Sequence, residues 1–224
     1  MNKTNNEHLL FRINYEYNKF MKAILRDYPK EFTLKDKKTK VLVRPMEEAD
    51  RNALLKFFRS LSERDRLYLR DDVTKEETID KWVKNINYEK VFPLLALHEK
   101  AIVADATLHR NEYSWTRHVG EIRIVVAEGF RRKGLGFILL REIFYIALRM
   151  GLHKVVAETA EDDLSAVRMF EKLGFQKEAV LKNHIMDPRA VKHNLLIMSN
   201  DVESLLRHMA DLEKELFPSR AMEG

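Results

Sequence analysis

The chain uses little glycine and places almost all of it in one stretch. Only seven of its 224 residues are glycine, a share of about 3% against an average near 7% in proteins. Six of the seven fall between residues 120 and 174, and they are Gly120, Gly129, Gly134, Gly136, Gly151 and Gly174. Glycine adopts backbone conformations that other residues avoid, and it lets another group approach the backbone closely. The stretch 120–174 is therefore where we expect special turns or close approaches.

Within this stretch, residues 124–136 predict a strand, a short basic loop and the start of a helix. The loop carries Arg131, Arg132 and Lys133 directly before Gly134. The first amides of a helix have no partner within the helix, and the helix dipole adds positive potential at that end. Such a loop can therefore bind a phosphate. It fits neither a P-loop, which needs Gly-Lys-Ser/Thr, nor a dinucleotide loop, because Leu139 stands where a third glycine is required.

Hydrophobic periodicity along the whole chain predicts a mixed α/β or α+β layer fold. Helices are expected at 7–27, 47–59, 62–70, 74–85, 135–150, 163–173 and 201–217. Strands are expected at 41–44, 94–98, 101–109, 121–126, 153–159, 175–181 and 191–198. We divide the chain into a basic helical extension with a charged linker (1–40), one domain (41–200) and a C-terminal amphipathic helix (201–224).

Composition excludes several classes of function. The chain has no cysteine, which excludes a disulfide scaffold, a thiol nucleophile and a cysteine-ligated zinc site. Its net charge of +5 comes from residues 1–40, which hold ten basic and five acidic residues, so the remainder is neutral. We therefore expect no nucleic-acid partner. Neither a signal peptide nor an apolar run of roughly 18–20 residues is visible, so we expect a cytoplasmic protein with no membrane partner.

The glycine loop and the elements around it resemble the GNAT family of acyl-CoA-dependent N-acetyltransferases. The family signature Arg/Gln-x-x-Gly-x-Gly/Ala appears as Arg131-Arg-Lys-Gly-Leu-Gly136 between a strand and a helix. A second family element is a helix that begins near an Asn and ends in Lys-x-Gly-Phe, and it appears here at residues 163–175. The resemblance covers roughly residues 41–199. It implies a mixed, mostly antiparallel central sheet flanked by helices, to which this chain adds N- and C-terminal helices.

The same resemblance implies that acetyl-CoA is the co-substrate and assigns the residues that hold it. The amides of residues 132–136 would bind its pyrophosphate, and the pantetheine arm would lie beside strand 124–126. There the N–H of Val125 or Val126 would polarise the thioester carbonyl. The predicted cofactor-binding residues are Ile124, Val125, Val126, Arg131, Arg132, Lys133, Gly134, Leu135, Gly136, Asp163 and Phe170.

Glu121 is the predicted catalytic base. Strand alternation places it on one face with Arg123, and GNAT enzymes often use a Glu on this strand to deprotonate the amine. An ammonium group with a pKa near ~10 has to lose a proton before it attacks. The alternative is that Glu121 pairs with Arg123 or another cation. Glu128, His118 and Asp105 are then the next candidates.

Two positions depart from the family pattern. Asp163 replaces the usual Asn, and an ionised Asp accepts hydrogen bonds but cannot donate them. The Tyr that often protonates the departing thiolate falls at Phe170, which has no acidic proton and which we expect to pack near the cofactor.

Metal binding is not expected. The histidines that come closest to a ligand set lack the i, i+4 spacing of a helical zinc site, and no cysteine supports them. They are His109, His118, His184 and His193.

A finer resemblance points to the catalytic domain of bacterial protein-lysine acetyltransferases. In those proteins a Ser, a Tyr and an Arg follow the first helix, as Ser62, Tyr68 and Arg70 do here. We expect acetyl transfer to a primary amine, either a protein lysine or a small molecule, by direct attack in a ternary complex. The alternative is an acyl-CoA-binding module without turnover, whose terminal helices contact a partner. The apolar faces of those helices are compatible with a homodimer.

Overall fold

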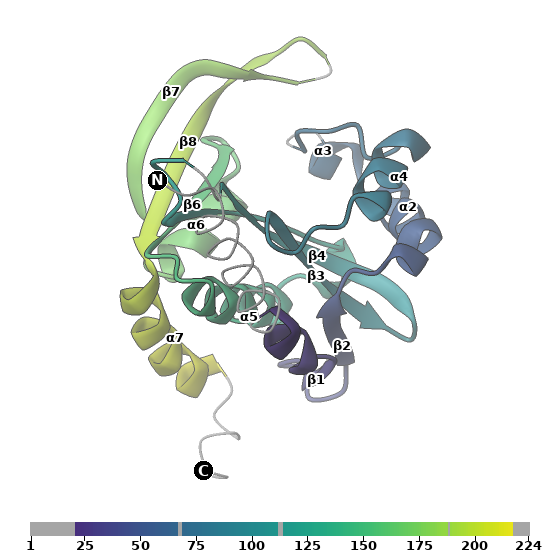
Figure 1. Cartoon of the computed structure of the whole chain (residues 1–224). Coiled ribbons are helices and arrows are strands. Elements are labelled where there is room, and N and C mark those ends of the chain that lie inside the picture. Colours follow the sequence, from purple (N-terminus) through teal and green to yellow (C-terminus); the bar gives the residue numbers. More distant parts are fainter. Residues whose placement is uncertain (1–20, 67–68, 112–113, 188, 217–224) are drawn as a thin grey trace, which may run out of the picture.

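One eight-stranded sheet with helices on both faces organises the chain (Figure 1). The computed structural model describes residues 21–66, 69–111, 114–187 and 189–216. The strands are β1 (Lys30–Thr33), β2 (Lys40–Pro45), β3 (Val91–His98), β4 (Ala101–Arg110), β5 (Val119–Val126), β6 (Lys154–Ala160), β7 (Gln176–Met186) and β8 (Lys192–Asp201). The helices are α2 (Arg51–Ser60), α3 (Glu63–Arg66), α4 (Glu76–Lys84), α5 (Leu135–Arg149), α6 (Leu164–Lys172) and α7 (Val202–Leu216), with 3-10 turns at Glu48–Asp50 and Glu128–Phe130.

The sheet is mostly antiparallel, as predicted. Its strands lie in the order β1-β2-β3-β4-β5-β6-β8-β7. Neighbours run antiparallel throughout except for β5 and β6, which run parallel. Helix α5 lies between these two strands in the sequence and supplies the crossover that a parallel pair requires.

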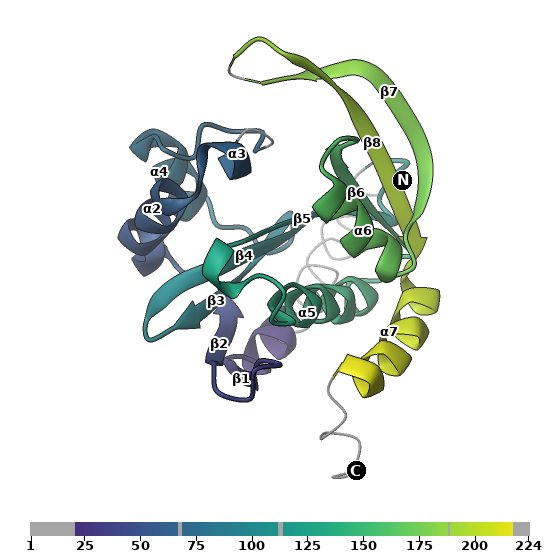
Figure 2. The same ribbon diagram turned by 180° about the vertical axis from the view of Figure 1, so that it is seen from behind.

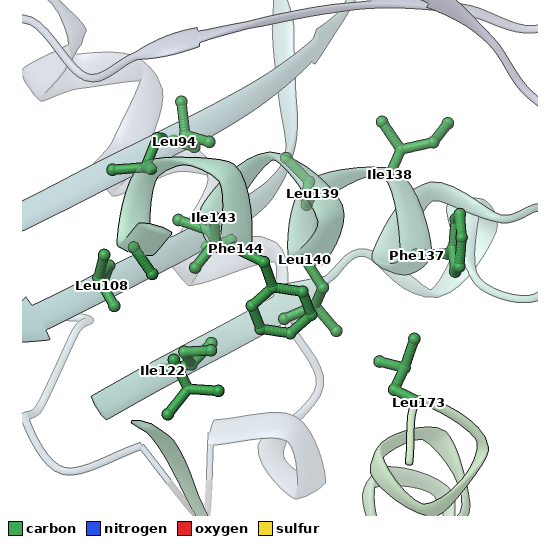
Figure 3. Packing of buried hydrophobic residues seen from close by; sticks show 14 of the residues in the cluster. Leu94, Leu108, Ile122, Phe137, Ile138, Leu139, Leu140, Ile143, Phe144 and Leu173 are labelled. Atoms are coloured by element: carbon green, nitrogen blue, oxygen red, sulfur yellow. The ribbon is translucent and has the colours of Figure 1, made fainter. Parts of the chain in front are cut away.

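Two apolar clusters hold the layers together. The larger one joins α5, α6 and α7 to one face of the sheet, and Figure 3 shows Leu140 and Phe144 of α5 near Ile122 of β5. The smaller one joins α2 and α4 to the other face, through side chains such as Phe58 and Leu95. Figures 1 and 2 show the consequence: α5 and α7 lie on one side of the sheet, α2 and α4 lie on the other, and the β7–β8 hairpin extends beyond both.

The N-terminal part differs from the prediction. Residues 33–40 are not a linker, because β1 pairs with β2 and the residues between them form the turn of a β-hairpin. The sequence signal for β1 was weak, since Phe32 is its only buried residue. Of the helix expected at 7–27, residues 21–26 are described and helical, and the rest lies outside the described residues.

Other boundaries shift as well. The helix expected at 62–70 is a single turn, Glu63–Arg66, and β7 and β8 extend several residues beyond the predicted strands. Within the described ranges, none of the helices combines the length and the apolar character needed to cross a bilayer.

A buried carboxylate fastens the N-terminal segment to α5. Glu142 is almost fully buried and accepts hydrogen bonds from Lys30 Nζ at 2.7 Å, Tyr28 Oη at 3.1 Å and Arg141 Nη2 at 3.2 Å. Removing one member of a buried ion pair leaves the other charge uncompensated. We therefore expect Glu142→Ala to lower the free energy of unfolding by about 2–4 kcal/mol in urea titrations.

The control for this measurement is Glu171→Ala. Glu171 forms an exposed ion pair with Lys177 at 3.5 Å, and such pairs contribute about 0–1 kcal/mol. Equal losses in the two variants would show that the Glu142 network does not anchor the segment.

Candidate active site

The site begins where β5 and β6 stop pairing. Their register runs from Val119↔Lys154 to Ile122↔Ala157, although β5 continues to Val126 and β6 to Ala160. Residues 123–126 therefore present one backbone edge that β6 does not cover. A cavity of about 1760 Å³ lies along this edge and along the start of α5.

Register decides which backbone N–H groups point into this cavity. The N–H of Ala127 donates to the carbonyl of Val103 at 2.9 Å, and the β4–β5 register continues without a bulge through Asp105↔Val125. Because backbone groups alternate sides along a strand, the N–H of Val125 faces β4. The N–H groups of Ile124 and Val126 face the uncovered edge. Of the two residues expected to polarise the thioester, the geometry therefore favours Val126.

The loop before α5 has the backbone of an anion site. Arg132 and Gly134 adopt positive φ angles of 60° and 85°, and the helical hydrogen bonds begin with Ile138 N–H to Gly134 O at 3.1 Å. The amides before residue 138 are therefore not used by the helix. A Cβ at Gly136 would meet Met169 Sδ at 3.5 Å and Ile124 Cδ1 at 3.9 Å, which are ordinary contacts. The fold does not require glycine there, whereas a ligand close to the backbone does.

The three basic residues of the loop have different surroundings. Arg131 donates to the carbonyl of Val126 at 2.9 Å and pairs with Asp65 of α3 at 2.7 Å, so it ties the loop to its neighbours. Lys133 lies 3.7 Å from Asp36 and over the ring of Phe130. The side chain of Arg132 is exposed. Leu135 is buried, so only its backbone can contact a phosphate.

Asp163 and Phe170, the two residues of the second family element that depart from the family pattern, both support the cavity. Asp163 caps α6 by accepting from the N–H of Ala166 at 3.2 Å. Phe170 is buried, with its ring centroid 5.1 Å from that of Phe175. Both residues line the cavity. Phe170 therefore packs as expected, and contact of either residue with the cofactor stays a prediction.

Glu121 is held by two guanidinium groups. Its Oε1 lies 2.9 Å from Arg123 Nε and 2.7 Å from Arg70 Nη2, and Arg70 also pairs with Glu158 of β6. The structure therefore has the pairing that was the alternative for Glu121, with both short contacts on Oε1, whereas Oε2 lies 3.5 Å from Arg70 Nη1. A role for Glu121 as the base stays a prediction. Tyr68, which belongs with Arg70 to the resemblance to protein-lysine acetyltransferases, lies outside the described residues.

Among the next candidates for the catalytic base, Asp105 has the most unusual surroundings. It shares a face of the sheet with Glu121 and lines the cavity, and its Oδ1 is buried without a hydrogen-bond partner among the described residues. Burial raises the pKa of Asp105 to about 7. Glu128 also lines the cavity, whereas His118 lies on the exposed loop before β5.

The histidines occupy separate places. Burial, reinforced by Arg123, lowers the pKa of His109 to about 4, so this ring is neutral at physiological pH. A hydrogen bond to Asp162 raises the pKa of His193. No group of three potential ligands that could hold a metal ion occurs in the part of the chain that the structure describes.

The pKa of Asp105 predicts a pH dependence of stability. A raised pKa means that the folded state holds the proton more tightly than the unfolded chain, so stability falls as the pH rises from about 4 to 7. Asp105→Asn removes this loss. We expect the stability of Asp105→Asn relative to wild type to rise by about 2–3 kcal/mol between pH 5 and 8, measured by urea unfolding at both pH values.

Asp201→Asn provides a control with the opposite sign. A hydrogen bond from the N–H of Ser204 lowers the pKa of Asp201, so its ionised form stabilises the fold at higher pH. Identical pH profiles for wild type and Asp105→Asn would contradict the account of Asp105.

Comparison with known proteins assigns this architecture. The sequence matches the family model described as "Acetyltransferase (GNAT) family" over residues 55–175. The fold is similar to a GNAT acetyltransferase from Streptococcus pneumoniae, with a TM-score of 0.63, 20% identity, and coverage of 72% of this chain and 99% of that one.

Two further structures add detail. The GNAT domain of S. lividans PAT has a TM-score of 0.65 and 15% identity, with coverage of 77% of this chain and 96% of that one. The putative acetyltransferase yncA from Salmonella typhimurium was solved with its cofactor acetyl-CoA. It has a TM-score of 0.61 and 18% identity, with coverage of 72% and 94%. At these identities the likeness shows the fold.

Proposed function

Since the chain belongs to the GNAT acetyltransferase family, we propose that it transfers an acetyl group from acetyl-CoA to a primary amine by direct attack in a ternary complex. This proposal depends on the backbone edge of residues 123–126, which ends beside the loop before α5. The amides of residues 132–136 in that loop have no backbone acceptor among the described residues. The edge thus offers N–H donors to a thioester, and the loop offers N–H donors to a pyrophosphate. Residues 41–200 hold the catalytic residues of this proposal, while β1 and α7 complete the same sheet and core.

The residues present fit acetyl-CoA. The amides of residues 132–136 would hold the pyrophosphate at the N-terminus of α5, with Arg131, Arg132 and Lys133 adding positive charge. The edge of residues 124–126 would pair with the amide groups of the pantetheine arm. Acetyl-CoA supplies the activated acetyl thioester, and the N–H of Val126 would donate to its carbonyl oxygen as negative charge develops there.

The amine needs a base, and Arg70 lies against both carboxylate oxygens of Glu121, at 2.7 Å from Oε1 and 3.5 Å from Oε2. Arg70 lies on the segment after α3, and its guanidinium pairs with both Glu121 and Glu158. An acceptor that displaced this guanidinium would free one carboxylate oxygen of Glu121. A role for Glu121 as the base would therefore require a movement of Arg70.

The acceptor class is also part of the proposal. The resemblance of Ser62 and Arg70 to bacterial protein-lysine acetyltransferases supports a protein lysine, and the likeness to S. lividans PAT is compatible with it. The hydroxyl of Ser62 donates a hydrogen bond to Asp65 Oδ2 at 2.7 Å, and Asp65 in turn forms an ion pair with Arg131 of the loop. A small-molecule amine remains the other acceptor that the cavity could admit.

A panel of acceptors tests the proposal. The protein is incubated with acetyl-CoA and with lysine peptides, amino acids or small primary amines, while thiol release and acetylated product are measured. We expect release to depend on an amine and to match the product formed, with a reaction lacking amine as the control.

The same experiment distinguishes the transferase from the second candidate function, an acyl-CoA-binding module without turnover. Phe170 cannot protonate a thiolate, and Glu121 is paired with two cations, which are features that a binding module without turnover could keep. Bound acetyl-CoA with no thiol release for any amine would replace the transferase proposal with that module.

A further inference from the structure

The cavity continues into an apolar pocket on the face of the sheet that α2 and α4 cover. Its walls are aliphatic and aromatic, with the rings of Phe58 and Trp82 in edge contact at 5.6 Å. The apolar residues that line it on this side are Met46, Leu54, Phe58, Val73, Trp82 and Ile86. Such walls suit the alkyl stem of an amine and contribute no charge of their own.

The side chain of Asp105 is one of the groups that line this cavity. Asp105 stands in register with Leu95 of β3 on one side and Val125 of β5 on the other, so its neighbours across the sheet are apolar. Its Oδ1 is buried and has no hydrogen-bond partner among the described residues. A buried polar atom without a partner is costly, and in a cavity it marks a place where a ligand or a water can donate.

The register of β4 and β5 places Asp105 nearer than Glu121 to the N–H of Val126, the proposed oxyanion donor. Asp105 is directly opposite Val125, which precedes the Val126 N–H, whereas Glu121 lies four residues back along β5, a distance of about 13 Å along the strand. The other charged or titratable groups that line the same cavity include Arg70, Asp71, Lys81, His109, Glu121 and Arg123.

We propose that Asp105 is the general base, which takes the proton of an acceptor ammonium carried on an apolar stem. This inference rests on the proposed function and names the acceptor class for it. The ionisation of Asp105 suits this role, because burial raises its pKa to about 7. A general base works best when its pKa lies near the operating pH.

Asp105 accepts one proton from the ammonium through a bridging water, and the freed nitrogen lone pair forms a bond to the thioester carbon. The tetrahedral intermediate then collapses as the C–S bond breaks and its electron pair goes to sulfur. The second proton of the nitrogen leaves with the CoA thiolate, which gives an amide and the thiol. Asp105 returns its proton to solvent.

The test compares Asp105→Asn with Glu121→Gln, both of which keep size and remove ionisation. We expect Asp105→Asn to lower kcat by about 100-fold or more while the Kd for acetyl-CoA stays within a few-fold. The loss is expected to shrink for an acceptor that is already neutral at the assay pH, which a merely structural role would not produce. In wild type, kcat/KM is expected to rise with pH through an inflection near 7.

Several outcomes would overturn the inference. They are wild-type kcat in Asp105→Asn, a loss that is the same for neutral and charged acceptors, and a wild-type profile without an inflection near 7. The profile needs no variant, so the inference stays testable if Asp105→Asn fails to fold. A loss confined to Glu121→Gln would assign the base to Glu121. If wild type acetylates no amine, the proposed function itself fails, and that result is distinct from an active wild type with an equally active Asp105→Asn.

Discussion

Val126→Pro is expected to lower kcat by about 100- to 1000-fold, the cost of removing one oxyanion donor, while the sheet stays intact. Proline has no N–H, and the N–H of Val126 faces the edge that β6 leaves uncovered rather than β4. The substitution thus deletes the proposed donor without deleting a hydrogen bond of the β4–β5 ladder. Steady-state kinetics of amine-dependent thiol release measure the loss.

Two other substitutions make this result specific. Val126→Ala keeps the N–H and is expected to retain kcat within a few-fold. Val125→Pro removes an N–H that faces β4, so it is expected to lower the urea midpoint, which Val126→Pro leaves near that of wild type. If Val126→Pro turns over at the rate of Val126→Ala, the N–H of Val126 does not stabilise the oxyanion.

Gly136→Asp is expected to weaken acetyl-CoA binding by about 40- to 100-fold. A carboxylate about 5 Å from a phosphate costs about 2–3 kcal/mol at an effective dielectric constant of about 25–30. An acidic residue in the first turn of a helix is favourable for the helix itself, and a Cβ at this position meets only ordinary contacts. Affinity should therefore fall without loss of fold, which equilibrium dialysis and urea unfolding together measure.

Gly136→Asn is the matched control, because it has nearly the same shape without the charge. We expect Gly136→Asn to lose only the part of the affinity that depends on close approach to the backbone. Equal affinities of Gly136→Asp and wild type for acetyl-CoA would place the pyrophosphate elsewhere.

Local sequence signals predicted the framework of the site. The basic loop and the helix after it follow from residues that are adjacent in the chain, and Gly134 has the positive φ that favours glycine. The helices expected at 135–150 and 163–173 likewise depend on a periodicity within one element, and α5 and α6 lie there. These features were confirmed because short-range preferences alone determine them.

Long-range pairing determined what the sequence did not predict. Arg70 and Glu121 are 51 residues apart, and only the folded chain brings them together. The choice of Val126 over Val125 required the register of β4 against β5. Asp105 lies between Leu95 and Val125 only because three strands pair, so its sequence signal was only one carboxylate in an apolar run. β1 gave little signal because one of its residues is buried.

Because the proposed contacts to acetyl-CoA are made by backbone amides, hydrogen–deuterium exchange with and without acetyl-CoA reports on them. We expect slower exchange in peptides that cover residues 122–138 when acetyl-CoA is bound, with the largest change at the start of α5 and at the end of β5. Unchanged exchange in these peptides at saturating acetyl-CoA would contradict this expectation and would leave the loop without its proposed role.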